Sequence, residues 1–159
     1  GKKNRFHHDD IGWNYRMTNI QATLGISQLS RIKDIVKTRH LVGLRYYNNL
    51  AKNKNIFIPE PKKEFAKNIY WVIGVLITNK KIKLDADKVM KKLKTLGIGT
   101  RPFFWPMNKQ KILKKFIVND KKFLNSEYIS KYGFYLPSSL SLKKSEIDLI
   151  CEKVNLILK

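Results

Sequence analysis

The sequence predicts a small α+β layer structure. Helical periodicity alternates with short strand-like runs along the chain, and the longest apolar run, residues 69–77, is only long enough for a strand. A chain of 159 residues with 43% hydrophobic and 11% aromatic residues can also bury a core. Residues 1–17 are expected to be irregular, because glycines and adjacent polar residues interrupt any period.

The first predicted helix begins at Thr18. Thr18 and Gln21 have the spacing of a capping box, in which each side chain bonds a backbone N–H group near the other residue. Apolar residues then recur at helical spacing: Ile20, Leu24, Leu29, Ile32, Ile35, Val36, Leu41, Leu44, Tyr47 and Leu50. A single helix of that length is atypical of a compact domain, so we expect a bend near residues 30–34.

The middle of the chain predicts a central strand followed by a helix. Residues 53–61 contain two prolines and form a connector or an edge. Residues 69–78 are apolar, β-branched and aromatic throughout, which predicts a strand covered on both faces. Asp85 then caps a helix over residues 86–96, and Gly97 supplies its left-handed end. Its expected buried positions are Val89, Leu93 and Leu96.

The remaining elements are shorter. We expect a strand at residues 98–101, a helix at 125–131, a strand at 133–136 and a terminal helix at 143–158. The terminal helix has an apolar stripe at Ile147, Ile150, Cys151, Val154, Ile157 and Leu158.

The net charge of +21, from 33 Lys+Arg and 12 Asp+Glu, raises the question of nucleic acid. The 27 lysines are scattered and the arginines number 6, whereas base-reading proteins favour arginine forks and exposed aromatics on one basic face. Specific nucleic-acid binding is therefore not expected. Codon usage in an AT-rich genome, nonspecific attraction to polyanions and steering of a phosphorylated substrate remain open explanations.

The chain has no apolar run of membrane-spanning length, and residues 1–10 carry no apolar signal region. Its one cysteine, Cys151, cannot form an intramolecular disulfide or a zinc site by itself. We therefore expect a cytoplasmic protein with no membrane partner.

Residues 7–10, His-His-Asp-Asp, have the donor types of a metal site. Adjacent residues do not readily reach one ion together, and no further ligand follows at helical spacing. A solvated or interface loop without a metal is the expectation.

Asn14 and Arg16 lie in residues 12–17, directly before the capped helix. An amide, a guanidinium and a helix N-terminus together favour a phosphate. The alternative is a structural turn in which Trp13 and Tyr15 pack.

Residues 100–106 place Arg101 before three aromatic residues, Phe103, Phe104 and Trp105. Aromatics beside an arginine can hold a nucleobase or a sugar, and they can equally fill the core. The sequence contains no serine elbow, P-loop or Gly-rich dinucleotide turn, so these residues indicate a binding half-site more than a complete active site.

Taken in order, these segments resemble the C-terminal part of the DegT/DnrJ/EryC1/StrS family of pyridoxal-phosphate-dependent sugar aminotransferases. The matching residues are 12–18, 20–22, 25–29, Arg39, Tyr46, Leu50, 97–104 and 135–138. Residues 101–104, Arg-Pro-Phe-Phe, are similar to perosamine-synthase-type members, which aminate C4 of a nucleotide-linked 4-keto-6-deoxy sugar.

The resemblance implies the small C-terminal domain of a fold type I pyridoxal-phosphate enzyme at residues 31–159, an α+β domain with a short, mostly antiparallel sheet packed with helices. It also implies that residues 1–30 are the tail of the large cofactor domain. The family's Schiff-base lysine, the aspartate paired with the pyridine nitrogen and the stacking aromatic lie upstream of its Gly-x-Asn-x-Arg block. None of the 27 lysines has such a context, so we expect a fragment, with no catalytic residue of its own, that is inactive alone.

The resemblance also implies roles for single residues. Asn14 inherits the family's reach to the cofactor phosphate of the neighbouring subunit of a homodimer, and Arg16 serves the same anionic region or the substrate diphosphate. Arg101, Phe103, Phe104 and Trp105 are the expected wall for the nucleotide sugar. Asn108 stands where many relatives have histidine and can at most hydrogen-bond the substrate.

The parent enzyme would take its amino group from glutamate and serve polysaccharide biosynthesis. Two alternatives stay open. A related member uses this fold for sugar dehydration, with histidine in place of the Schiff-base lysine. A basic module that binds polyanions or nucleic acid through dispersed lysines would instead show a steep dependence on salt.

Overall fold

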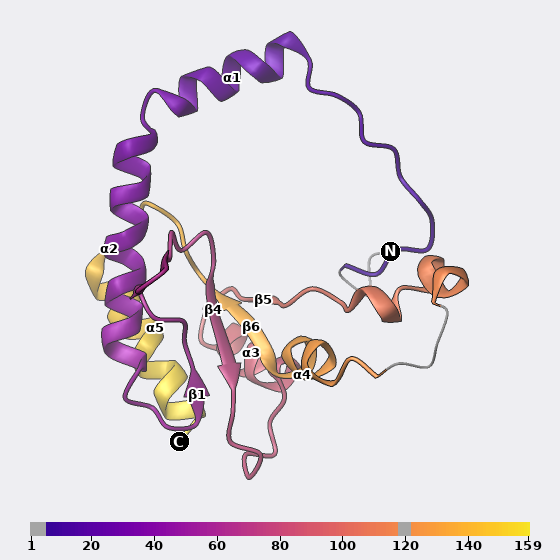
Figure 1. The fold of residues 1–159 in the computed structure, drawn as a ribbon. Coiled ribbons are helices and arrows are strands. Elements are labelled where there is room, and N and C mark those ends of the chain that lie inside the picture. Colours follow the sequence, from indigo (N-terminus) through magenta and orange to yellow (C-terminus); the bar gives the residue numbers. More distant parts are fainter. Residues whose placement is uncertain (1–5, 118–121) are drawn as a thin grey trace.

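A four-stranded antiparallel sheet lies at the centre of this computed structural model, which describes residues 6–117 and 122–159 (Figure 1). The strand order is β1-β4-β6-β5, and every neighbouring pair is antiparallel. The strands are β1 (Ile56–Phe57), β4 (Ile73–Ile77), β6 (Gly133–Leu136) and β5 (Arg101–Pro102). A separate hairpin pairs β2 (Lys62–Lys63) with β3 (Ala66–Lys67). The predicted α+β class with an antiparallel sheet is confirmed.

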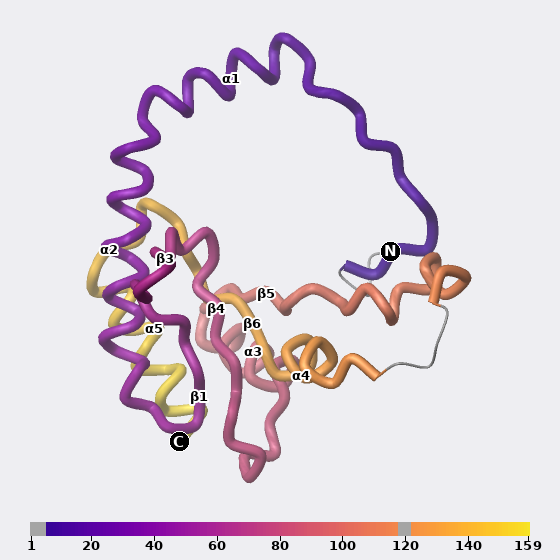
Figure 2. The backbone as a smooth tube through the Cα atoms, viewed as in Figure 1, coloured from indigo at the N-terminus to yellow at the C-terminus, as the bar shows by residue number. Residues whose placement is uncertain are grey.

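Five α-helices and two 3-10 helices accompany the sheet in the described residues. They are α1 (Asn19–Leu29), α2 (Ile32–Leu50), α3 (Ala86–Thr95), η1 (Met107–Lys109), η2 (Lys111–Phe116), α4 (Leu124–Tyr132) and α5 (Lys144–Ile157). Helices α2 and α5 pack side by side, and α3 packs against α5, β5 and β6 (Figure 2). No helix among the described residues is long and apolar enough to span a membrane.

One face of the sheet builds the core together with α2, α3 and α5. Ile73, Val75 and Ile77 of β4 alternate with half-buried residues, and all three are buried. They share one cluster with Tyr46, Leu50, Val89, Leu93, Phe134, Ile147 and Val154. The opposite face presents Gly74, Gly133 and the ring of Tyr135, and Phe103 packs over it. That second face positions the site described below.

The helix predictions are largely confirmed. Thr18 and Gln21 form the predicted capping box, and Asp85 accepts from the backbone N–H of Lys88. The predicted bend falls between α1 and α2 at Ser30, whose hydroxyl donates to the Ser27 carbonyl. Such a bond gives the backbone an alternative to continuing the helix.

Strand β4 begins at Ile73 rather than at residue 69. Tyr70 has a φ of 49°, so the chain turns just before the strand. The alternating burial of β4 also shows that one face is buried and the other only half-buried, so the prediction of full cover on both faces was wrong.

The region after α3 differs from the prediction as well. Gly97 has a φ of 77°, and the N–H groups of Gly97 and Ile98 donate to the carbonyls of Lys94 and Leu93. This is a Schellman ending, which uses Ile98 as part of the cap and delays the edge strand to Arg101. Leu96 lies in the same cap and is exposed, contrary to its predicted place on the buried stripe.

Helix α1 extends away from the sheet and from the other helices (Figure 1). None of its residues is buried, although Ile20, Leu24 and Leu29 recur at helical spacing. Residues 11–17 before it are also exposed and run back toward η1 and η2.

Hydrogen exchange should therefore separate this region from the sheet. In a monomeric sample, we expect amides of residues 11–30 to exchange much faster than those of β4, because none of these residues is buried. Protection of residues 11–30 equal to that of β4 would contradict this expectation. At higher concentration the apolar stripe of α1 should drive self-association, which analytical ultracentrifugation would detect.

Candidate functional site

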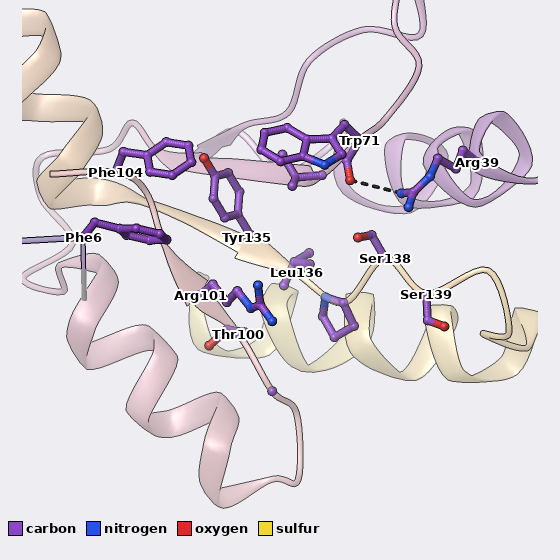
Figure 3. A pocket seen from close by; sticks show the side chains of 13 residues that line it. Phe6, Arg39, Trp71, Thr100, Arg101, Phe104, Tyr135, Leu136, Ser138 and Ser139 are labelled. Atoms are coloured by element: carbon purple, nitrogen blue, oxygen red, sulfur yellow. Dashed lines mark hydrogen bonds between the residues drawn. The ribbon is translucent and has the colours of Figure 1, made fainter. Parts of the chain in front are cut away.

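A pocket of about 670 Å³ opens on the second face of the sheet (Figure 3). Its lining comes from five parts of the chain: Phe6, Arg39, Trp71, Val72, Gly99, Thr100, Arg101, Phe104, Tyr135, Leu136, Pro137, Ser138 and Ser139. Phe6, Phe104 and Tyr135 lie toward one end, and Arg39, Ser138 and Ser139 lie toward the other. No acidic residue is among these lining residues, so the described part of the pocket is positively charged and partly aromatic.

Arg101 lies between the two ends of the pocket (Figure 3). It is the first residue of β5 and pairs with Tyr135 of β6 in the sheet register. Pro102 follows it, which suits an edge strand because proline has no N–H group to give to a further neighbour. Within the described residues, the Arg101 side chain forms no hydrogen bond or ion pair. Its five N–H donors are therefore available to an anionic ligand.

Arg39 of α2 has a different role in this structure. Its Nη1 donates to the carbonyl oxygens of Tyr70 at 3.2 Å and of Trp71 at 3.1 Å. This contact holds the turn before β4, in which Tyr70 adopts a left-handed φ. Trp71 is 63% exposed and lines the pocket beside it. Arg39 therefore positions Trp71 while adding positive charge to the pocket.

Tyr70 anchors this turn from inside the core. Its hydroxyl donates to the Pro59 carbonyl at 3.3 Å, and burial raises its pKa to about 12. The ring lies against the backbone of α2 at Gly43, where any Cβ atom would overlap it. Glycine at position 43 is what allows this close approach.

The aromatic end of the pocket is built on Tyr135. Its ring meets the Phe103 ring edge-on at 4.4 Å between centroids and the Phe104 ring at 6.3 Å. Burial raises the pKa of Tyr135, so its phenol stays neutral at physiological pH and can donate a hydrogen bond. Phe6 completes this end, with its ring 4.6 Å from that of Phe104.

The structure separates the residues that the sequence grouped as a substrate wall. Arg101 and Phe104 both line the pocket. Phe103 instead packs over Gly74 and Gly133, where a side chain at Gly133 would overlap its ring. Trp105 stacks on His7 at 4.2 Å and donates from Nε1 to the Lys109 carbonyl.

Asn108 is half-buried in η1 and does not line the pocket. Phe103 and Trp105 line a separate hollow of about 430 Å³ together with His7. The split follows from backbone geometry, because successive side chains of an extended segment point to opposite sides.

Asn14 and Arg16 lie in the exposed segment before α1 and are not among the residues that line this pocket. Neither side chain forms a hydrogen bond within the described residues, so both are open to a phosphate or to another chain. The structure does not bring them together with Arg101.

Residues 7–10 form a loop in which His7 is half-buried and the other three residues are exposed. His7 stacks on Trp105, and Asp9 lies 3.9 Å from Lys111. Among residues 6–117 and 122–159, no three His, Cys, Asp or Glu side chains gather in a way that could hold a metal.

Sequence reasoning missed Phe6, Trp71, Tyr135, Ser138 and Ser139 as pocket residues. Trp71 was assigned to a strand, and the turn at Tyr70 that exposes it has no signal in residue type. Arg39, Tyr135 and Ser138 are among the residues that match the family. That match is the signal that could have indicated their place in the pocket.

Comparison with known proteins agrees with this fold. The family model for the DegT/DnrJ/EryC1/StrS aminotransferase family matches residues 1–155. GDP-perosamine synthase of Caulobacter vibrioides is 29% identical over 97% of this chain and 41% of its own length. The chain therefore spans about two fifths of the length of that relative.

Two solved structures share the fold. Helicobacter pylori PseC, an aminotransferase involved in the biosynthesis of pseudoaminic acid, matches 98% of this chain and 42% of its own with a TM-score of 0.77 and 21% identity. Escherichia coli GDP-4-keto-6-deoxy-D-mannose-3-dehydratase with bound hydrated PLP matches 93% and 37% with a TM-score of 0.73 and 20% identity.

The fold and the family match together define the class: the chain has the α+β fold shared by pyridoxal-phosphate-dependent sugar aminotransferases. It belongs to the DegT/DnrJ/EryC1/StrS aminotransferase family, whose members use pyridoxal phosphate.

Proposed function

We propose that this chain is the C-terminal part of an aminotransferase that acts on a nucleotide-linked keto sugar, and that the pocket around Arg101 holds the sugar nucleotide. The observation that carries the proposal is an arginine without a protein acceptor among the described residues, set in an aromatic-lined pocket of a chain from this family. A diphosphate suits the free guanidinium, and a hexose or base face suits Trp71 or Phe104.

The donor groups of residues 12–18 fit the phosphate of pyridoxal phosphate. Asn14 offers an amide and Arg16 a guanidinium, both exposed, next to the N-terminus of α1. When bound, the cofactor carries the amino group from glutamate to the keto carbon. Residues 1–30, which include α1, would belong to the large cofactor domain, and residues 31–159 to the small domain. Asn14 would reach the cofactor of the second subunit in a cytoplasmic homodimer.

The chain's own residues bind and orient the sugar nucleotide in this proposal. Arg101 would hold the diphosphate, and Tyr135 would donate from its neutral phenol to a substrate oxygen. Phe103 and Trp105 would support the wall from behind, since they pack on the sheet and on His7. The similarity to a GDP-perosamine synthase favours amination at C4 in polysaccharide biosynthesis. The lysine that would hold the cofactor would lie in a preceding domain, so residues 1–159 alone would not transaminate.

A sugar dehydratase is the second candidate, because a dehydratase acting on a GDP-linked keto sugar shares the fold. Both candidates need the same sugar-nucleotide pocket. They differ in the residue that would hold the cofactor, which has no counterpart in these residues.

Titration with nucleotides tests the proposed pocket. We expect GDP or dTDP to shift the NMR signals of Thr100, Arg101 and Ser138, with GMP binding more weakly because it lacks the second phosphate. The polyanion alternative predicts a different result: salt-sensitive shifts of similar size at lysines across the surface, and no shift at Thr100, Arg101 or Ser138.

Replacing Asn14 with alanine tests the cofactor role. In the cofactor-loaded dimer that contains this segment, we expect cofactor retention to weaken about tenfold, since a lost hydrogen bond to a charged group costs about 1.5 kcal/mol. Equilibrium dialysis measures the retained cofactor. Asn19→Ala is a control on the neighbouring exposed first turn of α1. Unchanged retention in Asn14→Ala would show that the assigned role is wrong.

A further inference from the structure

Gln110 carries a polar carboxamide and is buried, with 5% of its surface exposed. It joins η1 to η2, and its backbone N–H donates to the Met107 carbonyl. A buried amide is costly unless both its donor and its acceptor are satisfied. Its partners therefore indicate what the residue does.

Both ends of the Gln110 carboxamide bond the backbone of the N-terminal segment. Nε2 donates to the Phe6 carbonyl at 2.7 Å, and Oε1 accepts from the His8 N–H at 3.0 Å. These partners are more than 100 positions away in sequence. A primary amide has a donor and an acceptor side by side, so it can pair with one carbonyl and one N–H of an extended chain as a neighbouring strand would.

The bonded segment is also held by its side chains. The Phe6 ring contacts Phe104, and the His7 ring stacks on Trp105. Phe6 has a φ of 66°, a left-handed conformation that is rare for an aromatic residue. Such a conformation persists where surrounding contacts hold it. Phe6 lines the pocket in this conformation.

We propose that Gln110 is a positioning residue that pins residues 6–8 against Phe104 and Trp105 and so holds Phe6 in place as a wall of the pocket. Gln110 itself does not line the pocket, so it acts through Phe6. The role of Phe6 in ligand binding rests on the proposed function, which is the binding of a sugar nucleotide in this pocket.

Amide hydrogen exchange tests the pinning without any ligand. The Gln110→Met variant keeps the size of the side chain and removes both hydrogen bonds. We expect the His8 amide to exchange about tenfold faster in this variant, while β4 keeps its protection. Lys111→Ala is the matched control, because Lys111 joins the same two segments through an exposed ion pair with Asp9. It should leave His8 unchanged. Unchanged exchange of His8 in Gln110→Met would overturn the proposal.

A double-mutant cycle with GDP as the probe tests the action through Phe6. Phe6→Ala and Gln110→Met should each weaken GDP binding about three- to tenfold, since each removes the same aromatic contact. The double variant should bind no more weakly than Phe6→Ala alone. Independent, multiplying effects, or a Gln110→Met variant with a lower melting temperature and unchanged GDP affinity, would show a merely structural role and overturn the proposal.

His8→Pro provides a second variant in case Gln110→Met fails to fold. This substitution removes the backbone N–H group that donates to Oε1 of Gln110. The His8 side chain is exposed, so its loss should disturb the packing little. GDP affinity should again fall as it does in Phe6→Ala, and unchanged affinity would contradict the proposal. If the wild-type chain binds no GDP, the proposed function fails, and the exchange of His8 alone decides whether Gln110 pins the segment.

Discussion

Replacing Arg101 with alanine is expected to weaken the binding of a nucleoside diphosphate by about 30-fold to 700-fold. Removing one partner of a hydrogen-bonded charge pair costs about 2–4 kcal/mol, and each 1.4 kcal/mol is a factor of ten. The effect should be this large because Arg101 is the pocket arginine whose guanidinium has no protein acceptor among the described residues. Arg39 is less free to take over this contact, since its Nη1 already donates to the carbonyls of Tyr70 and Trp71.

Isothermal titration calorimetry with GDP at fixed salt measures this loss. Arg31→Ala is the matched control, because it removes the same charge from an exposed site before α2. The net charge of +21 attracts any polyanion, so a general electrostatic effect would weaken both variants alike. Equal affinities for Arg101→Ala and Arg31→Ala would place the diphosphate elsewhere.

Replacing Gly43 with alanine is expected to lower the free energy of unfolding by about 3 kcal/mol, at the upper end of the usual cost of overpacking. The new methyl group would overlap the Tyr70 ring. Tyr70 is 2% exposed. Its hydroxyl donates to the Pro59 carbonyl, and its backbone N–H donates to Oδ1 of Asn68. It therefore has little freedom to move away from α2.

Urea denaturation measures the change from the shift of the midpoint at constant slope. Gly25→Ala is the control, because Gly25 lies in α1 with no atom within 4 Å of the added Cβ. Alanine is the better helix former, so Gly25→Ala should leave stability unchanged or raise it by up to about 1 kcal/mol. An equally mild effect in Gly43→Ala would show that the Tyr70 turn can shift.

Residues 103–105 show what a residue pattern can and cannot predict. The spacing of Phe103, Phe104 and Trp105 allows two interpretations: the rings form a wall of the substrate site, or they fill the hydrophobic core. In the structure Phe103 packs on the sheet, Phe104 lines the pocket and Trp105 stacks on His7. Neither interpretation holds for all three residues, because the direction of each side chain depends on the surface against which it packs.

Several local elements and the family resemblance could be predicted from residue types alone. The capping box at Thr18, the cap at Asp85, the left-handed end at Gly97 and the bend after α1 all depend on residues within a few positions of one another. Such interactions are readable from residue type because their geometry is fixed by the local backbone.

Which residues form the pocket depends on contacts between elements that are distant in sequence. Phe6, Trp71, Arg101 and Tyr135 come from distant parts of the chain. They meet because β6 pairs with both β4 and β5, and because Arg39 and Gln110 each bond a backbone segment remote in sequence. These contacts depend on strand register, a left-handed turn at Tyr70 and close approach at Gly43. Such features arise from packing between elements, which local sequence patterns do not encode.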